Sequence, residues 1–241
     1  MGLAVKHLPA QSLFFAQGLE CDSNSFVSSA QRRASSIMSA RNRINVFCRF
    51  RPQNDREQSE NGQLCLQQQQ QPKDSTPLSG QVNLQTLDGD YHSFSFDRIF
   101  FPDSTQSEVF ESTGLPIIES VLAGFNGAII AYGQTGAGKT WTMEGSRDEE
   151  SNRGIIPRSM DKLFDYAREA GSHIEFEVKV SYVEIYNENI RDLLRSANTE
   201  KTTTTTSSLQ IRGSKVVGAN EIFVTSAVEM ERILEIGANT R

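Results

Sequence analysis

Long apolar runs are missing from this chain, and so is any excess of positive charge. No apolar stretch approaches the roughly 18 residues that a membrane-spanning helix needs. The formal net charge is −6, from 24 Lys and Arg against 30 Asp and Glu. An acidic balance disfavours a general binder of nucleic acid or of anionic membrane surfaces. We therefore expect neither nucleic acid nor a membrane among the partners of this protein.

Cysteine is scarce, with 3 residues, at positions 21, 48 and 65. The number is odd and the spacing matches no zinc-ligand pattern, so the sequence predicts reduced thiols in a cytosolic protein. Targeting signals are weak as well. Lys6 stands where a myristoylation signal would have Ser or Thr. Glu20 and Asp22 disfavour a transit peptide in the Ser-rich segment that follows.

Polar tracts divide the chain into parts. Residues 1–43 are rich in Ser, Ala and Gln without sustained periodicity, which predicts a flexible N-terminal leader. Order is expected over residues 44–241. A polar insert at about 54–80, which contains Gln67–Gln71, and a Thr-rich loop at about 199–208 should interrupt it as surface loops.

The remaining segments alternate between strand and helix signals. Apolar or alternating runs predict strands at 44–50, 125–132 and 174–182, and a hairpin that pairs 82–87 with 91–96. Helices are expected after the capping boxes Thr105–Glu108 and Ser226–Glu229, and another is entered through Pro157. Alternation of strands and helices implies an α/β layered domain.

One stretch carries specific chemistry, and its residues are Gly133, Gln134, Thr135, Gly136, Ala137, Gly138, Lys139 and Thr140. It fits the phosphate-binding P-loop pattern, in which glycines let backbone N–H groups approach phosphate oxygens. Lys139 would place a cation against the β and γ phosphates, and Thr140 would offer its hydroxyl to Mg²⁺. A helix that begins at the loop would aim its positive end at the same anion. A dinucleotide site is excluded, because Trp141 stands where the third glycine would be.

Motifs on both sides of this loop extend the prediction. They are Arg49-Phe50-Arg51-Pro52, Phe94-Ser95-Phe96-Asp97, the run 125–140, Gly154-Ile155-Ile156-Pro157-Arg158 and the segment 181–194. In order and spacing they resemble the kinesin motor domain, from about Ile44 to Arg241. The resemblance implies a P-loop NTPase-type layered fold, with a central, mostly parallel sheet flanked by helices and incomplete at the C-terminus. It also implies a cytoplasmic, microtubule-associated ATPase that uses ATP and Mg²⁺.

The resemblance assigns roles to four residues outside the loop. Arg49, Arg51 and Pro52 match the segment that packs on the adenine, and Trp141 falls where the family places a side chain against the base. An indole and a guanidinium plane are suited to stacking on a purine. The alternatives are that both arginines are solvated or paired with a carboxylate, and that Trp141 packs in the core.

Two further residues match a microtubule-contacting loop of the family, namely Arg212 and Lys215. The hairpin of this loop is shortened between Lys215 and Val217, and two solvated charges are the alternative. Full-length members of the family often dimerise through a coiled coil. The resemblance therefore implies tubulin as the partner, with only weak contacts from this chain.

Hydrolysis in kinesins relies on two later motifs, Asn-x-x-Ser-Ser-Arg-Ser-His and Asp-x-x-Gly-x-Glu. Neither occurs in the 241 residues, so no catalytic residue is identified. We expect a truncated motor that holds ATP without completing hydrolysis and that folds poorly alone, because apolar strand edges would lack cover. One alternative is a non-catalytic nucleotide-binding or microtubule-binding module. A small-molecule or nucleotide kinase, the other alternative, would share only the loop.

Overall fold

The computed structural model describes residues 44–60, 80–85, 89–170, 176–195, 209–213 and 215–240, together with two short strands at Phe14–Ala16 and Leu66–Gln67. Most of the predicted leader, the glutamine tract and the Thr-rich loop lie outside these residues. The strand at Phe14–Ala16 falls within the predicted leader, and the short helix Asp55–Ser59 falls within the predicted insert. Neither element was predicted from the sequence.

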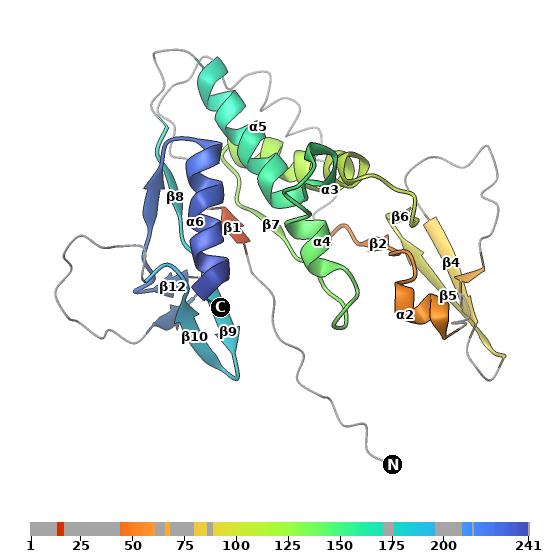
Figure 1. Cartoon of the computed structure of the whole chain (residues 1–241). Coiled ribbons are helices and arrows are strands. Elements are labelled where there is room, and N and C mark those ends of the chain that lie inside the picture. The colour runs from red at the N-terminus through yellow and green to blue at the C-terminus, as the bar shows by residue number, and fades with distance from the viewer. Residues whose placement is uncertain are drawn as a thin grey trace.

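The described helices are α2 (Asp55–Ser59), α3 (Gln106–Leu122), α4 (Lys139–Met143), the 3₁₀ turn η1 (Glu150–Asn152), α5 (Ile155–Glu169) and α6 (Ala227–Thr240). The described strands are β1 (Phe14–Ala16), β2 (Phe47–Arg49), β3 (Leu66–Gln67), β4 (Gly80–Gln85), β5 (Tyr91–Phe96), β6 (Arg98–Phe100), β7 (Gly127–Ile129), β8 (Val178–Val180), β9 (Val183–Tyr186), β10 (Asn189–Asp192), β11 (Gln210–Arg212), β12 (Lys215–Val217) and β13 (Ile222–Val224). Figure 1 shows α3, α4 and α5 at the centre, between the β4–β5 hairpin and α6 with β8.

The predicted α/β class is confirmed, but the strand pairing differs in detail from a central, mostly parallel sheet. Among the described strands, only β2 and β6 pair in parallel, with Phe47 opposite Arg98. The strand that leads to the P-loop, β7, pairs antiparallel with β1, and the other pairs are antiparallel as well. Two strands pair in parallel only when they run in the same direction. The described neighbour of β7 is β1, which runs in the opposite direction.

Local signals predicted the starts of α3 and α6. The capping box of α3 is present, with the Thr105 side chain accepting from the Glu108 N–H and the Glu108 carboxylate accepting from the Thr105 N–H. At α6, the Glu229 N–H donates to Ser226 Oγ, while its carboxylate accepts from the Thr225 N–H. The strand predicted at 174–182 is shorter than expected, since β8 covers only Val178–Val180 before β9 begins at Val183.

The core lies where α3, α5 and α6 meet the strands β6, β8 and β13. Close approach of β7 to α3 requires glycine at position 127, because a Cβ there would lie 2.5 Å from Ile117 Cγ2. The buried cluster comprises Phe100, Val109, Phe110, Met143, Ile155, Ile156, Met160, Val180, Leu194, Val224, Met230 and Ile233. Since α3 packs on both β7 and α5, this core holds the strand that carries the P-loop.

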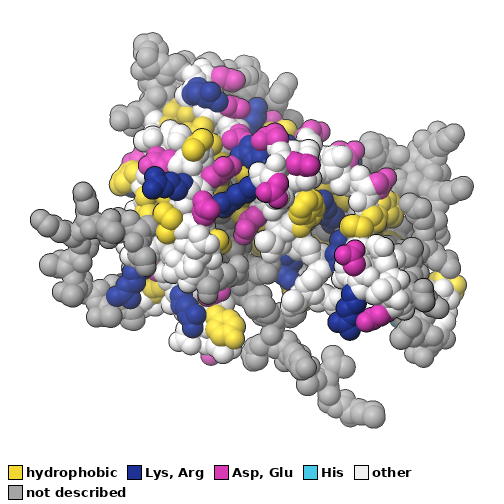
Figure 2. All heavy atoms as spheres, in the orientation of Figure 1, with side chains coloured by type: hydrophobic (Ala, Val, Ile, Leu, Met, Phe, Trp, Pro, Cys, Tyr) yellow, Lys and Arg dark blue, Asp and Glu magenta, His cyan; other side chains and the backbone are white. Residues whose placement is uncertain are grey.

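The outer surface is mixed in charge. On the face shown in Figure 2, acidic and basic side chains are interspersed, with small apolar areas between them. No helix among the described residues has both the length and the apolar character needed to cross a bilayer.

Candidate nucleotide-binding site

The P-loop connects β7 to α4, so the predicted order of strand, loop and helix is confirmed. Gly138 has φ of 90° and forms the N-terminal cap of α4, a left-handed conformation that favours glycine. The Thr142 N–H donates to Gly138 O at 2.9 Å, which closes the first turn of the helix. Met143, at the end of α4, is buried in the core and anchors this short helix.

Lys139 folds back over the loop that precedes it. Its Nζ donates to Gly133 O at 2.7 Å and to Gln134 O at 2.8 Å. The ammonium is thus held against the loop backbone, next to Thr140, whose side chain is exposed at the first turn of α4. A cation, a hydroxyl and the N–H groups of a helix start come together here, which is the chemistry of a site for phosphate and its metal ion.

Arg51 lies beside the loop and is fixed in two directions. Its Nε donates to Gly136 O at 2.7 Å, and its two terminal nitrogens donate to the Glu57 carboxylate at 2.7 and 2.6 Å. The Pro52 carbonyl accepts a further bond from Arg51, and the Pro52 ring is exposed. The paired alternative for Arg51 is therefore realised with Glu57. Contact of Arg51 and Pro52 with a base remains a prediction.

Pairing with Arg51 lowers the pKa of the Glu57 carboxyl. Hydrogen bonds from Arg51 and from the Asn54 N–H lower the pKa of Glu57 to about 2. Because the folded-state pKa is depressed, the pair contributes stability above the ordinary Glu pKa of about 4.3 and loses it as pH falls toward 2. In an NMR titration the Glu57 carboxyl should have its midpoint near pH 2, and Arg51→Met should return it toward about 4.3. An unshifted midpoint in the unsubstituted protein would contradict the pairing.

The Arg49 side chain points into the interior, whereas Arg51 pairs with Glu57. Its Nη1 donates to Gln106 Oε1 at 2.8 Å and to Thr142 Oγ1 at 3.0 Å. Burial lowers the pKa of the Arg49 guanidinium. A fully solvated arginine does not fit these contacts, since this guanidinium ties β2 to the start of α3 and to Thr142 of α4. Its predicted contact with the adenine remains a prediction.

Trp141 follows the loop directly and is 42% exposed. Complete burial in the core, the alternative for this residue, is therefore not what the structure shows. Its carbonyl accepts a hydrogen bond from Gln106 Nε2 at 2.7 Å. The exposed indole is available for stacking beside the loop, and the base contact remains a prediction.

The two residues of the predicted microtubule contact belong to another element, the β11–β12 hairpin. Arg212 and Lys215 are opposite one another in this ladder. The Arg212 side chain is exposed and donates to Gln210 Oε1 at 3.2 Å. The contact of this hairpin with tubulin remains a prediction.

Sequence reasoning missed Gln106, which joins Arg49 to the backbone of Trp141. A signal for it exists in the sequence. Gln106, Val109 and Phe110 stand at positions i, i+3 and i+4 of α3, so the glutamine shares the buried face of this helix. A polar side chain on a buried face must find hydrogen-bond partners, which marks it as a residue that holds other groups in place.

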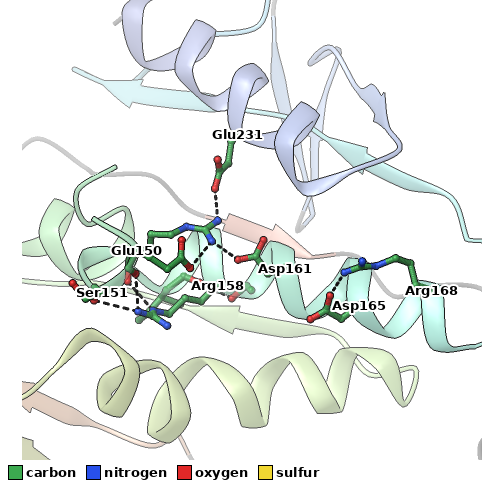
Figure 3. A network of polar contacts seen from close by, with 10 residues as sticks. Glu150, Ser151, Arg158, Asp161, Asp165, Arg168 and Glu231 are labelled. Atoms are coloured by element: carbon green, nitrogen blue, oxygen red, sulfur yellow. Dashed lines mark hydrogen bonds and ion pairs between the residues drawn. The ribbon is translucent and has the colours of Figure 1, made fainter. Parts of the chain in front are cut away.

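Arg153 stands in the charged segment after α4, yet it is largely buried, with 17% of its side chain exposed. It forms ion pairs with Glu150, with Asp161 of α5 and with Glu231 of α6. Figure 3 shows Asp161 and Glu231 reaching toward one another from their two helices. Burial alone would lower the pKa of Arg153, but hydrogen bonds to the three carboxylates raise it above its ordinary value.

A cavity with a volume of about 340 Å³ lies beside this network. Side chains from the 144–153 segment, α5 and α6 line it, and none of the residues 133–140 does. The cavity is therefore separate from the P-loop.

The α/β layers and the strand–P-loop–helix unit define the class of protein: this is a P-loop NTPase fold. Comparison with known families narrows the class. The family model of the kinesin motor domain matches residues 49–241. The chain therefore belongs to the kinesin motor domain family, as the motifs predicted.

Individual relatives agree with this assignment. The kinesin heavy chain of Syncephalastrum racemosum is 39% identical over 201 residues, which are 83% of this chain and 20% of that protein. Kinesin-like protein 3 of Schizosaccharomyces pombe is 40% identical over 199 residues, covering 82% of this chain and 34% of that protein. A solved structure of a fast kinesin superposes with a TM-score of 0.69 at 36% identity, covering 82% of this chain and 52% of that one. This chain thus spans a minor part of its curated relatives.

Proposed function

We propose that this chain is the ATP-binding part of a microtubule-based motor, one that converts ATP hydrolysis into movement along microtubules in the cytoplasm. The observation that carries the proposal is the P-loop with Lys139 held against Gly133 O and Gln134 O, in a member of the kinesin motor domain family. The fast kinesin that superposes on this chain is described for its ATPase mechanism and its interactions with microtubules, which supports the same roles here.

The residues around the loop fit ATP with Mg²⁺. The backbone of residues 133–140 would hold the phosphates, Lys139 would face the β and γ phosphates, and Thr140 Oγ1 would be a ligand of Mg²⁺. When bound, the metal ion neutralises charge on the phosphate oxygens. Arg49, Arg51, Pro52 and Trp141 would form the base side of the site, because they surround the loop on its β2 and α4 sides.

A second function is favoured by one observation about the sequence. Neither switch motif of the family occurs in these 241 residues, which is consistent with a module that binds nucleotide or microtubules without turnover. In that case Arg212 and Lys215 would still offer a weak contact with tubulin. Both functions predict that the 241-residue chain binds nucleotide without microtubule-stimulated phosphate release.

We expect the 241-residue chain to bind a fluorescent ATP analogue in the presence of Mg²⁺, and the affinity to fall about ten-fold or more when EDTA removes the metal. Phosphate release should not be stimulated by microtubules. Fluorescence titration and a coupled phosphate assay check the two statements. Failure of a folded chain to bind MgATP would contradict the proposed function. A cooperative thermal melt together with microtubule-stimulated phosphate release would contradict the expectation that binding occurs without turnover.

A further inference from the structure

Gln106 is a buried polar residue whose amide is fully engaged. The residue is 4% exposed and stands at the first position of α3. The Oε1 atom accepts from Arg49 Nη1 at 2.8 Å. The Nε2 atom donates to Trp141 O at 2.7 Å and to Asn152 O at 3.1 Å. Both ends of the amide are thus in use, which assigns its orientation without ambiguity.

The three partners of Gln106 come from three separate segments. Arg49 ends β2, Trp141 lies in α4, and Asn152 ends the η1 turn. Arg49 also donates to Thr142 Oγ1, so Gln106 and Thr142 together set the direction of its guanidinium. The amide therefore fixes the position of β2 relative to α4, beside the loop that joins β7 to α4.

The P-loop itself does not depend on these contacts. Its internal bonds are those of Lys139 Nζ to Gly133 O and Gln134 O and that of the Ala137 N–H to Gln134 O at 3.1 Å. None of the three hydrogen bonds of the Gln106 amide reaches residues 133–140. Binding of phosphate by the loop and positioning of the side chains beside the loop can therefore be tested separately.

We propose that Gln106 is a positioning residue of the nucleotide site, one that sets Arg49 and Trp141 for the nucleoside part of ATP and leaves the phosphate-binding loop unaffected. The inference rests on the proposed function, since it assumes that ATP occupies the loop. According to this inference, the buried Gln106 amide gives the site its preference for a nucleotide over a polyphosphate that lacks a base. A buried amide at this place is costly unless all its bonds are made, so its loss would leave Trp141 O and Asn152 O without this donor.

Two ligands separate this role from general support of the fold. MgATP uses the loop and its neighbours, whereas magnesium tripolyphosphate can use only the loop. With Gln106→Met, which is similar in size, we expect the Kd for MgATP to rise about ten-fold and the Kd for magnesium tripolyphosphate to change less than about two-fold. The matched control is Gln81→Met, a substitution of an exposed glutamine on β4 that should change neither Kd.

Intrinsic fluorescence provides a second reading, because Trp141 is the only tryptophan of the chain. Addition of MgATP should quench its emission in the unsubstituted protein. Gln106→Met and Gln106→Glu should both shift the emission of the free protein and weaken the quenching, since both lose the donor to Trp141 O.

Each outcome decides the inference. An equal rise in the Kd for both ligands, or an unchanged Kd for both, overturns the inference while the proposed function stands. Loss of the folded state in both variants, seen in thermal melts, overturns it too, because Gln106 would then be a residue of the fold alone. If the unsubstituted, folded chain binds tripolyphosphate and MgATP equally well, there is no base subsite to position. If it binds neither ligand, the proposed function fails and the inference falls with it.

Discussion

Replacement of Lys139 by alanine should abolish measurable binding of MgATP, with a loss in affinity of at least about a hundred-fold. The ammonium makes two hydrogen bonds to the loop, at 2.7 Å to Gly133 O and 2.8 Å to Gln134 O. In the complex it would exchange these neutral acceptors for charged phosphate oxygens. Hydrogen bonds between charged groups contribute about 1.5–3 kcal/mol each, so the loss of two accounts for the expected change.

The substitution has a matched control in Lys162→Ala. Lys162 is exposed on α5 and lies outside the loop, so its replacement should leave the affinity within about two-fold. Isothermal titration with MgATP measures both variants, and thermal melts check that each is folded. An affinity of Lys139→Ala within about ten-fold of the unsubstituted protein would show that phosphate is not bound at this loop.

Local patterns of the sequence predicted the parts of the site that depend on neighbouring residues. The path from β7 through the P-loop to α4 follows from an apolar run, glycines and a lysine within one continuous stretch. Likewise, the start of α3 follows from the Thr105–Glu108 capping box, because both partners lie within one helical turn. Such features are determined by backbone geometry over a few residues, which is why a single sequence is sufficient to predict them.

Contacts between segments that are far apart in the chain could not be predicted from the sequence. The bond from Arg49 to Gln106 joins residues 57 positions apart, and the bond from Arg153 to Glu231 joins residues 78 apart. Charge patterns along the chain do not reveal such partners, because any of several carboxylates could serve. The pairing of β7 with β1 was missed for the same reason, since strand order depends on tertiary packing and β1 has only three residues.

The Arg153 cluster, defined as Arg153 with Glu150, Asp161 and Glu231, carries the second large effect. Arg153→Met should lower the free energy of unfolding by about 2 kcal/mol and the melting temperature by roughly 4–8 °C. Removal of the cation leaves carboxylates on α5 and α6 facing each other without compensation. The two are partly exposed, at 38% for Asp161 and 37% for Glu231, so water screens them and the loss stays below that of a fully buried pair.

A second arginine on the same part of the chain offers the matched control. Arg168 of α5 pairs with Asp165, but its side chain is 78% exposed, so Arg168→Met should change the unfolding free energy by less than about 0.5 kcal/mol. Arg153→Lys should recover only part of the stability, because a single ammonium cannot present the planar fork that reaches several carboxylates at once. Chemical denaturation of the three variants measures these differences.

Coupling between the two helices can be tested directly with a double-mutant cycle on Arg153→Met and Glu231→Gln. The Glu231 substitution removes the α6 carboxylate and keeps the side chain's size, so it should partly relieve the unpaired charge that Arg153→Met leaves behind. We expect the two changes together to cost at least about 0.5 kcal/mol less than their sum. Because α6 packs directly on α5, additive effects would mean that apolar packing, with Met160 and Ile233 in the same buried cluster, holds the helices together without the ion pair.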